Sequence, residues 1–350
     1  MTQILILPGD GIGPEITSST ETILRAANDR FDLGLTFRHA DIGFAALDKT
    51  GTTFPDTVLA AAKEADGIVL GPVSHNDYPP RDKGGINPSG ALRIGLDLFA
   101  NIRPARTRAA LPIPAGIPFD LVIYRENTEG FYTDRNMVSG PGEFMPDPDM
   151  ALAIRKITRR ASARIAEAAF AAAAERPAEH VTAVHKANVL RISDGLFLEE
   201  TRRVAALYPQ ITYDEVLVDA MTAHLVREPG RFDVIVTTNM YGDILSDLAG
   251  ELSGSLGTAA SLNLGATHAM AQAQHGSAPL IAGKGVANPA ALIGSAALLL
   301  NWLGMDKAGH AISDALENSL ANPKTRTVDL DGTATTDEVT HTIVSRLKSA

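Results

Sequence analysis

Two aspartates four positions apart, Asp243 and Asp247, are the first residues of this sequence with an evident capacity for chemistry. They follow the apolar run 232–238, which predicts a buried strand, and the segment from Gly242 onward predicts a helix. Residues four apart lie on one face of a helix, about one turn from each other. The two carboxylates therefore indicate either half of a divalent-metal site or two surface acids.

Three arginines form a second set of interest. Arg93 lies in a predicted helix, Arg103 begins the next segment, and Arg125 ends a predicted buried strand. Arginine suits two-pronged binding of carboxylates, and an unpaired guanidinium at a buried strand end is costly. Each arginine alone is explained by a structural ion pair. Together, in an acidic chain, they fit a substrate with at least two carboxylates.

Further groups that could transfer protons or bind anions follow other apolar segments. Lys186 and Asn188 come just after the predicted strand 181–184, where they could cap the chain or face a bound anion. Asp219 ends another apolar stretch, and Tyr132 follows the strand that ends near Arg125. These residues complete the inventory of possible proton-transfer groups and acids.

A glycine cluster near the N-terminus, Gly9 to Gly13, suggests the glycine-rich fingerprint of dinucleotide-binding folds. Its third glycine, Gly13, comes two positions after Gly11 rather than three, and Pro14 follows at once. This spacing does not match the Rossmann pattern. The cluster instead predicts a tight strand-to-helix turn, which can still line a ligand site.

Composition limits the classes of function. The chain has 350 residues and a formal net charge of -10, so nucleic acid and anionic membranes are poor partners. It has no cysteine, which excludes disulfides, thiolate chemistry and cysteine-based metal sites. Its first residues lack the basic lead of a signal peptide, and residues 296–301 are too short an apolar run for a membrane span. We therefore expect a cytoplasmic protein.

Strands and helices alternate in the first part of the chain, which predicts a largely parallel, covered sheet. A long alanine-rich helix is predicted at 149–175, and loop or hairpin material at 131–148. The predicted strands are 4–7, 35–40, 67–70, 120–124, 181–184, 211–216 and 234–236. The sequence predicts an α/β protein in two lobes.

Seven short motifs follow one another along the chain. They are Gly9-Asp-Gly-Ile-Gly-Pro-Glu15, Asp97-Leu-Phe-Ala-Asn-Ile-Arg-Pro104, Arg125-Glu-Asn-Thr-Glu-Gly-Phe-Tyr132, Lys186-Ala-Asn-Val-Leu190, Asp219-Ala-Met221, Gly242-Asp-Ile-Leu-Ser-Asp247 and His275-Gly-Ser-Ala-Pro279. Their order is that of the β-decarboxylating dehydrogenases. The chain resembles a member of the isocitrate/3-isopropylmalate dehydrogenase family from residue 4 to about residue 335.

The resemblance implies a role for each set. An arginine cluster and a serine would hold a malate-type 2-hydroxy acid by its two carboxylates and its 3-substituent: Arg93, Arg103, Arg125 and Ser89. Three acids would bind Mg²⁺ or Mn²⁺: Asp219, Asp243 and Asp247. Oxygen ligands are what such hard cations prefer. The metal would polarise the substrate hydroxyl and stabilise the enolate that remains after CO₂ leaves.

Two residues would transfer protons. Lys186 would take the proton of the hydroxyl group, and Tyr132 would donate a proton to the enolate carbon. In family members the lysine and the first metal acid, here Lys186 and Asp219, come from the partner subunit. The active unit would then be a homodimer with shared active sites, with a tetramer as an open alternative. Residues 131–148 would form part of an intersubunit arm.

The resemblance also implies a two-lobed fold with mixed sheets rather than a Rossmann fold, in agreement with the glycine spacing. Residues 1–99 and 252–350 would form the large, cofactor-binding lobe. Residues 100–251 would form the small lobe, which carries the dimer interface.

Cofactor choice depends on the motif near His275. Six residues would contact the cofactor: Asn188, His275, Gly276, Ser277, Ala278 and Asn288. NAD-using relatives usually place an aspartate after the proline of this motif, where it accepts from the adenosine ribose hydroxyls, but here the residue is Leu280. NADP-using relatives place Lys-Tyr there and a Tyr and an Arg further on. This chain has Leu280-Ile281, and residues 328–332 contain no Tyr or Arg, so no cation meets the extra phosphate. We expect NAD, weakly bound, in preference to NADP.

Substrate choice depends on residues 87–93. Isopropylmalate enzymes carry bulky leucines there, whereas isocitrate enzymes carry Ser and Asn, and this chain has the same two types in swapped places, Asn87 and Ser89. Homoisocitrate enzymes usually add an arginine where this chain has Gly90. The small, polar lining predicts isocitrate, homoisocitrate, tartrate or malate, with 3-isopropylmalate as the alternative.

Two other classes of function remain as alternatives. Some relatives are non-catalytic regulatory subunits, which lose the lysine, the tyrosine or the metal acids, whereas this chain keeps them all. A Rossmann 2-hydroxy acid dehydrogenase without decarboxylation would need no metal and would use a His/Asp base that the sequence does not supply.

Overall fold

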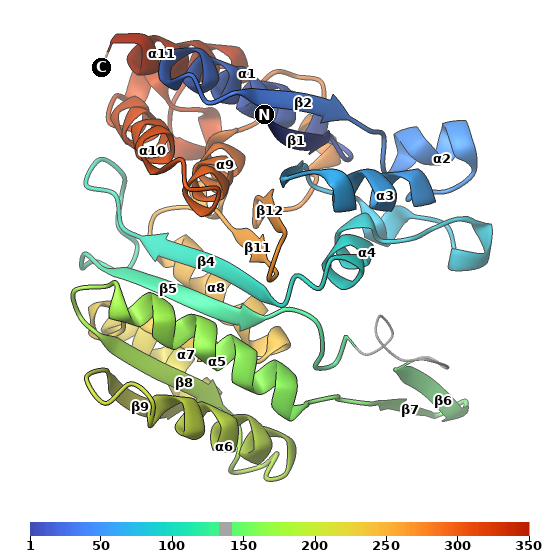
Figure 1. Ribbon diagram of the computed structural model, residues 1–350, viewed down its shortest axis with the longest axis vertical. Helices are drawn as coiled ribbons and strands as arrows, with labels where there is room; N and C mark the ends of the chain where they lie inside the picture. Colours follow the sequence, from blue (N-terminus) through green and yellow to red (C-terminus); the bar gives the residue numbers. More distant parts are fainter. Residues whose placement is uncertain (133–141, 350) are drawn as a thin grey trace. The chain divides into compact units, whose positions relative to one another are not determined.

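The computed structural model describes residues 1–132 and 142–349, and the chain divides into two compact units (Figure 1). Unit 1 comprises Met1–Leu96, Arg108–Pro112 and Gly254–Ala350, and unit 2 comprises Asp97–Thr107 and Ile113–Ser253. Both units combine helices with strands in mixed sheets, so the predicted α/β class is confirmed. The assignment of residues 1–99 and 252–350 to a cofactor-binding lobe stays a prediction.

Unit 1 is built on five strands in the order β2-β1-β3-β12-β11. Every pair is parallel except β11 with β12. The strands are β1 (Thr2–Leu7), β2 (Leu35–His39), β3 (Gly67–Leu70), β11 (Leu262–Leu264) and β12 (Ala269–Gln272). The apolar runs of β1 and β3 are almost fully buried, as expected for parallel strands covered on both faces.

Seven helices accompany this sheet in the part of unit 1 that the structure describes. They are α1 (Gly13–Phe31), α2 (Phe44–Thr50), α3 (Asp56–Glu64), α4 (Pro88–Gly95), α9 (Ala290–Trp302), α10 (Asp306–Leu320) and α11 (Thr336–Ser349). Pro14 lies in the first turn of α1, where its missing N–H leaves no hydrogen bond unmade. Helix α1 packs against α9 and α11, and the apolar α9 also packs against β12. None of the described helices is long and apolar enough to cross a membrane.

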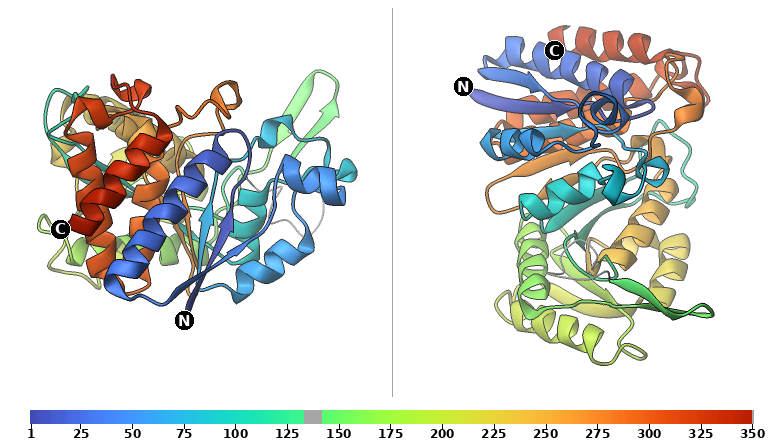
Figure 2. Two further views of the ribbon diagram at one scale, coloured as in Figure 1. Left: turned by 90° about the horizontal axis from the view of Figure 1, so that it is seen from above. Right: turned by 90° about the vertical axis from the view of Figure 1, so that its right-hand side faces the viewer.

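The main sheet of unit 2 has five strands in the order β4-β5-β10-β8-β9, with β4 antiparallel to β5 and the other pairs parallel. The strands are β4 (Ala100–Arg106), β5 (Asp120–Glu126), β8 (His180–His185), β9 (Thr212–Leu217) and β10 (Val234–Thr237). The helices are α5 (Arg159–Ala174), α6 (Ser193–Ala205), α7 (Val218–Arg227) and α8 (Asn239–Leu252). Helices α5 and α6 cover one face of the sheet, and α7 and α8 cover the other (Figure 2).

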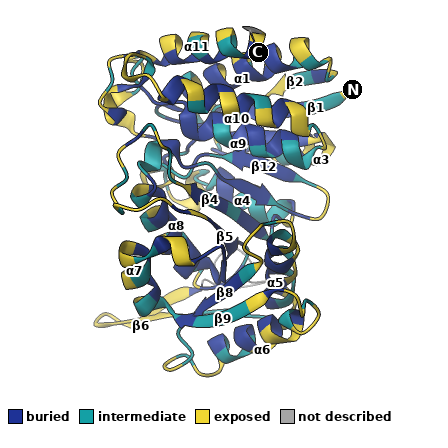
Figure 3. Cartoon of the chain, turned by 90° about the vertical axis from the view of Figure 1, so that its left-hand side faces the viewer, coloured by how far each residue is buried: buried dark blue, intermediate teal, exposed yellow. Residues whose placement is uncertain are grey.

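The central strands of each main sheet are buried and the outward sides of the helices are exposed (Figure 3). In unit 2 the parallel strands β5, β8 and β10 end at the same edge of the sheet. Polar groups that follow parallel strands meet at such an edge, which is where α/β proteins bind ligands. Arg125, Lys186 and the start of α8 all lie there.

The predicted helix at 149–175 begins later than expected, at Arg159. The side chain of Thr158 accepts from the Ala161 N–H and caps the helix. Before it, β7 (Met150–Ala153) pairs in antiparallel fashion with β6 (Glu143–Asp147), and both strands are exposed. The predicted arm at 131–148 falls partly on residues 133–141, which lie outside the described residues, so its role stays a prediction.

Replacing Phe170 by alanine tests the packing of unit 2. The Phe170 ring is fully buried in α5, 5.5 Å from the ring of Tyr208 and 5.9 Å from that of Tyr213. We expect Phe170→Ala to lower the free energy of unfolding in urea by about 3–5 kcal/mol because it leaves a cavity. Leu207→Ala, at a position 65% exposed, is the control and should change it by less than about 0.5 kcal/mol. Equal effects of the two variants would contradict this packing.

Candidate active site

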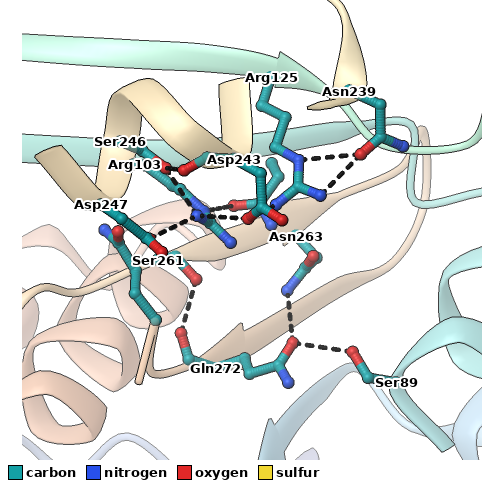
Figure 4. Close-up of polar contacts among 12 residues, drawn as sticks. Ser89, Arg103, Arg125, Asn239, Asp243, Ser246, Asp247, Ser261, Asn263 and Gln272 are labelled. Carbon is teal, nitrogen blue, oxygen red and sulfur yellow. Dashed lines mark hydrogen bonds and ion pairs between the residues drawn. The ribbon is translucent and has the colours of Figure 1, made fainter. Parts of the chain in front are cut away.

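Two buried arginines lie side by side on neighbouring strands of unit 2 (Figure 4). Arg103 and Asn101 are two apart on β4, so their side chains share one face of the sheet. Asn101 is directly opposite Arg125 on β5, which places Arg125 on the same face. Helix α8 packs against β4 and β5. Strand alternation therefore aims both guanidinium groups at this helix.

Helix α8 presents three oxygen-bearing side chains to these arginines, because Asp243, Ser246 and Asp247 are spaced three and four apart. Arg103 Nη1 donates to Asp243 Oδ1 at 3.1 Å, to Ser246 Oγ at 2.6 Å and to Asp247 Oδ1 at 3.3 Å. Arg125 Nη1 donates to Asp243 Oδ1 as well. Asp243 is therefore shared between two guanidinium groups.

Asn239 and Gly242 set the approach of α8 to Arg125. Asn239 Oδ1 accepts from Arg125 Nε at 3.0 Å and from Nη2 at 2.6 Å. A Cβ atom at Gly242 would lie 2.6 Å from Cγ of Arg125, so only glycine permits this distance between helix and strand. The glycine and the asparagine thus fix where the two aspartates meet the arginines.

The cluster balances two guanidinium groups against two carboxylates. Burial and the neighbouring Arg125 lower the pKa of Arg103 to about 10, so Arg103 stays protonated at neutral pH. Burial raises the pKa of Asp247, and the negative charge of Asp243 adds to this while Arg103 opposes it. The side chains of Asp243 and Asp247 keep 36% and 53% of their surface exposed. Two accessible carboxylates one turn apart are a donor set that fits Mg²⁺ or Mn²⁺.

Tyr132 belongs to the same cluster. Its hydroxyl donates to Asp243 Oδ2 at 3.2 Å, and its ring lies 5.9 Å from the guanidinium of Arg125. Tyr132, the predicted proton donor, therefore contacts the predicted metal ligand Asp243 and the predicted substrate-binding residue Arg125.

Lys186 and Asp219 contact each other instead of this cluster. Lys186 follows β8, Asp219 lies in the first turn of α7, and the lysine ammonium donates to the aspartate. This hydrogen bond lowers the pKa of Asp219, whose side chain is 64% exposed. Among the described residues, no group of three His, Asp or Glu lies close enough to hold a metal ion. The three predicted metal ligands are thus not assembled within one chain.

Ser89 and Arg93 lie in unit 1, where both donate to Gln272 of β12. The contact between Ser89 and Gln272 is drawn in Figure 4. Gln272 Oε1 accepts from Ser89 Oγ at 3.1 Å, from Arg93 Nη2 at 3.2 Å and from Asn263 Nδ2 at 3.4 Å. Sequence reasoning missed Gln272 and Asn263. The feature of the sequence that could have indicated them is a single polar residue in each of two short, otherwise apolar segments. Asn87, considered as a substrate contact, caps α4 by accepting from the Gly90 N–H.

A cavity of about 460 Å³ in unit 1 contains four of the six predicted cofactor residues. Its lining is Ile12, Gly257, His275, Gly276, Ala278, Ile281, Val286, Asn288, Val328 and Asp329. Sequence reasoning missed Asp329, whose Oδ2 accepts from Asn288 Nδ2 at 2.8 Å. Asn188 lies in unit 2, where it is exposed. A mainly apolar cavity with a few polar groups is typical of a small-molecule or cofactor site.

Ser277, the remaining predicted cofactor residue, holds the glycine turn at the edge of this cavity. Its carbonyl accepts from the Ile12 N–H at 2.9 Å, and its hydroxyl lies 2.7 Å from that of Ser74. Gly11 has φ +58°, and a Cβ there would lie 2.0 Å from the Ser277 carbonyl oxygen. Ile12 of this turn lines the cavity, and its role in a ligand site stays a prediction.

Two buried glutamates, Glu126 at the end of β5 and Glu129 shortly after it, were not predicted as site residues. Glu126 accepts from the N–H groups of Thr128 and Glu129, and Glu129 accepts from the N–H and the hydroxyl of Thr158. The Glu129 carbonyl also accepts from Asn239 Nδ2 at 3.0 Å. Glu129 therefore connects the start of α5 with the residue that holds Arg125.

The model of the family described as isocitrate/isopropylmalate dehydrogenase matches residues 3–343. The chain is 40% identical over 351 residues to the isocitrate/homoisocitrate dehydrogenase of Thermus thermophilus, covering 99% of both chains. It is 41% identical over 350 residues to the 3-isopropylmalate dehydrogenase of Methanothermobacter thermautotrophicus, covering 99% of this chain and 98% of the relative.

A solved structure gives the same relationship in three dimensions. The crystal structure of isocitrate dehydrogenase from Methylococcus capsulatus superimposes with a TM-score of 0.90 at 37% sequence identity, and the match covers 100% of both chains.

Glu129→Gln tests the buried acid beside the site through the pH dependence of stability. Burial raises the pKa of Glu129 to about 7. The folded chain therefore binds a proton more tightly than the unfolded chain, and stability falls as the pH rises from about 4.5 to about 7. Glutamine cannot ionise. We therefore expect the free energy of unfolding of the variant to fall by roughly 1–2 kcal/mol less than that of the wild type across that pH range. Identical pH profiles of the unfolding free energy would contradict the assignment.

Proposed function

Because the chain belongs to the isocitrate/isopropylmalate dehydrogenase family, a family of decarboxylating dehydrogenases, we propose that it catalyses the NAD-dependent oxidative decarboxylation of a malate-type 2-hydroxy acid with a small or polar 3-substituent. The observation that carries this proposal is the pairing of two buried arginines with two accessible aspartates on α8. Arg103 and Arg125 supply fixed donors for carboxylates, and Asp243 and Asp247 supply oxygens for a divalent cation.

The lining near Ser89 supports a compact or polar substrate. Ser89 is buried, and its hydroxyl contacts the amide of Gln272 rather than an apolar side chain. Isocitrate, homoisocitrate, tartrate and malate carry a small or polar group at the 3-position. The 41% identity to a 3-isopropylmalate dehydrogenase favours 3-isopropylmalate as the second candidate.

In the proposed mechanism the chain binds the substrate, moves two protons and orients the bond that breaks. Arg103 and Arg125, with Arg93, hold the substrate carboxylates, which replace Asp243 as partners of the buried guanidinium groups. A divalent cation at Asp243 and Asp247 would supply Lewis acidity next to the substrate hydroxyl. Lys186 would accept the proton of the substrate hydroxyl, and Tyr132 would donate a proton to the carbon that loses CO₂. NAD, when bound, would supply the hydride acceptor.

A second copy of the chain would complete this site. Asp219 and Lys186 do not join Asp243 and Asp247 within one chain. We propose a homodimer in which each chain supplies Asp219 and Lys186 to the other. The presence of Tyr132 and Lys186 together with all three acids argues against a non-catalytic regulatory subunit.

The cavity near His275 supports NAD rather than NADP. Among the residues that the structure describes, the lining includes the carboxylate of Asp329 and neither Lys nor Arg. Burial lowers the pKa of His275, so this side chain is neutral at pH 7. A 2′-phosphate on the adenosine ribose would meet a negative charge and no cation there.

A substrate panel tests the proposed function. The purified chain is assayed for NADH and NADPH formation with isocitrate, homoisocitrate, tartrate, malate and 3-isopropylmalate, each with Mn²⁺ and with EDTA. We expect the highest kcat/KM for one of the first four acids with NAD, complete loss of activity in EDTA and its return on adding Mn²⁺. A 3-isopropylmalate kcat/KM far above the others would overturn the substrate assignment. Turnover in EDTA would overturn the mechanism, and no turnover with any acid would favour a regulatory subunit.

Leu280→Asp tests the account of the cofactor cavity. Leu280 is 86% exposed and stands next to the lining residue Ile281. A carboxylate there can accept hydrogen bonds from the ribose hydroxyls, so we expect the KM for NAD to fall roughly five- to twentyfold. Leu280→Asn, of the same shape but neutral, is the control and should lower it less. An unchanged KM for NAD in Leu280→Asp would show that the ribose lies elsewhere.

A further inference from the structure

Arg155 and Asp194 form a buried ion pair in unit 2, outside the cluster of the candidate site. Arg155 precedes α5, Asp194 lies in the first turn of α6, and Arg155 Nη1 donates to Asp194 Oδ1. The side chains are 8% and 0% exposed. Removing two charges from water costs about as much as their attraction returns, and apolar residues often replace such a pair without loss of stability. Stability alone therefore does not explain this pair.

The second oxygen of Asp194 holds the segment that carries Lys186. Asp194 Oδ2 accepts from the backbone N–H of Lys186 at 2.5 Å. The Lys186 carbonyl in turn accepts from the N–H groups of Val189 and Leu190, which closes a turn after β8. The Asp194 N–H donates to the Leu190 carbonyl at 3.0 Å. The carboxylate thus fixes the direction in which the chain leaves β8, and with it the base of the Lys186 side chain.

The guanidinium of Arg155 contacts the other two reacting segments. Its Nη2 donates to Thr238 Oγ1 at 3.1 Å, immediately before α8. It also lies 5.4 Å from the ring of Tyr241, two residues before Asp243, and 5.8 Å from the ring of Phe131, next to Tyr132. One buried pair therefore touches the lysine turn, the start of the helix that carries the acids, and the tyrosine segment.

We propose that Arg155 and Asp194 are positioning residues that set the Lys186 turn relative to the start of α8 and to the Tyr132 segment. The proposal rests on the proposed function, in which Lys186 accepts the hydroxyl proton. In a homodimer with shared sites, α8 of one chain serves its own site while Lys186 serves the other. The ion pair then connects the two active sites of the dimer mechanically, without touching substrate.

Three variants of the full-length chain separate positioning from stability. Asp194→Asn keeps an oxygen for the Lys186 N–H but removes the charge that holds Arg155. Arg155→Met removes the cation. The double variant Arg155→Met with Asp194→Leu replaces the pair by apolar residues, so that no buried charge is left alone. Asp233→Asn is the matched control, because Asp233 forms a partly buried pair with Arg176 at the opposite end of α5.

The assay uses the best substrate of the panel with saturating NAD and Mn²⁺. Both single variants should lower kcat roughly ten- to hundredfold and change the substrate KM by less than about threefold, because a small misplacement of the base slows the reacting step. The double variant should regain the wild-type Tm while its kcat stays low. Asp233→Asn should lower Tm and leave kcat unchanged. Recovery of kcat together with Tm in the double variant would overturn the proposal and show a structural role only.

Amide hydrogen exchange supplies a second measurement that does not depend on activity. We expect the backbone amide of Lys186 and the first turn of α8 to exchange faster in the double variant than in the wild type, and to be unchanged in Asp233→Asn. Faster exchange in a chain without dehydrogenase activity would leave the positioning role standing and refute the proposed function. Unchanged exchange, with unchanged kcat in an active enzyme, would overturn the positioning role.

Discussion

The attraction between two buried arginines and the acids of α8 is the interaction on which the candidate site depends. Arg103 and Arg125 are held inside unit 2 with little access to water, so each needs anionic or polar oxygens nearby. Asp243 accepts hydrogen bonds from both arginines. Ser246 and Asp247 also accept from Arg103, and Asn239 accepts from Arg125. The same oxygens are suited to a divalent cation, and the same guanidinium groups to carboxylates. In the proposed function, this network would exchange these internal partners for metal and substrate.

Much of this could be predicted from the sequence because the decisive residues follow regular periodicities. Buried strands and helix starts are predicted by apolar runs next to glycine or proline, and the spacing of four places Asp243 and Asp247 on one face of a helix. The strand β4, which carries Arg103 and pairs with β5, is not among the predicted strands. The predicted helix at 149–175 begins ten residues before the observed one, which starts at Arg159. Residues 150–153 instead pair with residues 143–147, which the alanine-rich composition does not indicate. Local propensity does not reveal a pairing with residues 143–147.

Contacts between distant segments account for what the sequence did not predict. Gln272 joins Ser89 and Arg93 only because β12 returns beside β3 some two hundred residues later. Asp329 reaches Asn288 from a short turn with no periodic pattern. In the sequence, Asp194 is an ordinary acid in the first turn of a helix, and nothing indicates that it accepts from the Lys186 N–H. In each case a polar residue in a common position acquires its role from tertiary packing.

The central claim is that acids and arginines of one chain act with Lys186 and Asp219 of a second. Mixing two inactive variants, Lys186→Met and Asp247→Asn, and allowing their subunits to exchange tests it most directly. In a mixed dimer one site then holds both defects and the other holds none. The account predicts that an equimolar mixture recovers about a quarter of the wild-type kcat, because half the dimers are mixed and each has one intact site. No recovery in dimers shown to be mixed would contradict the shared site.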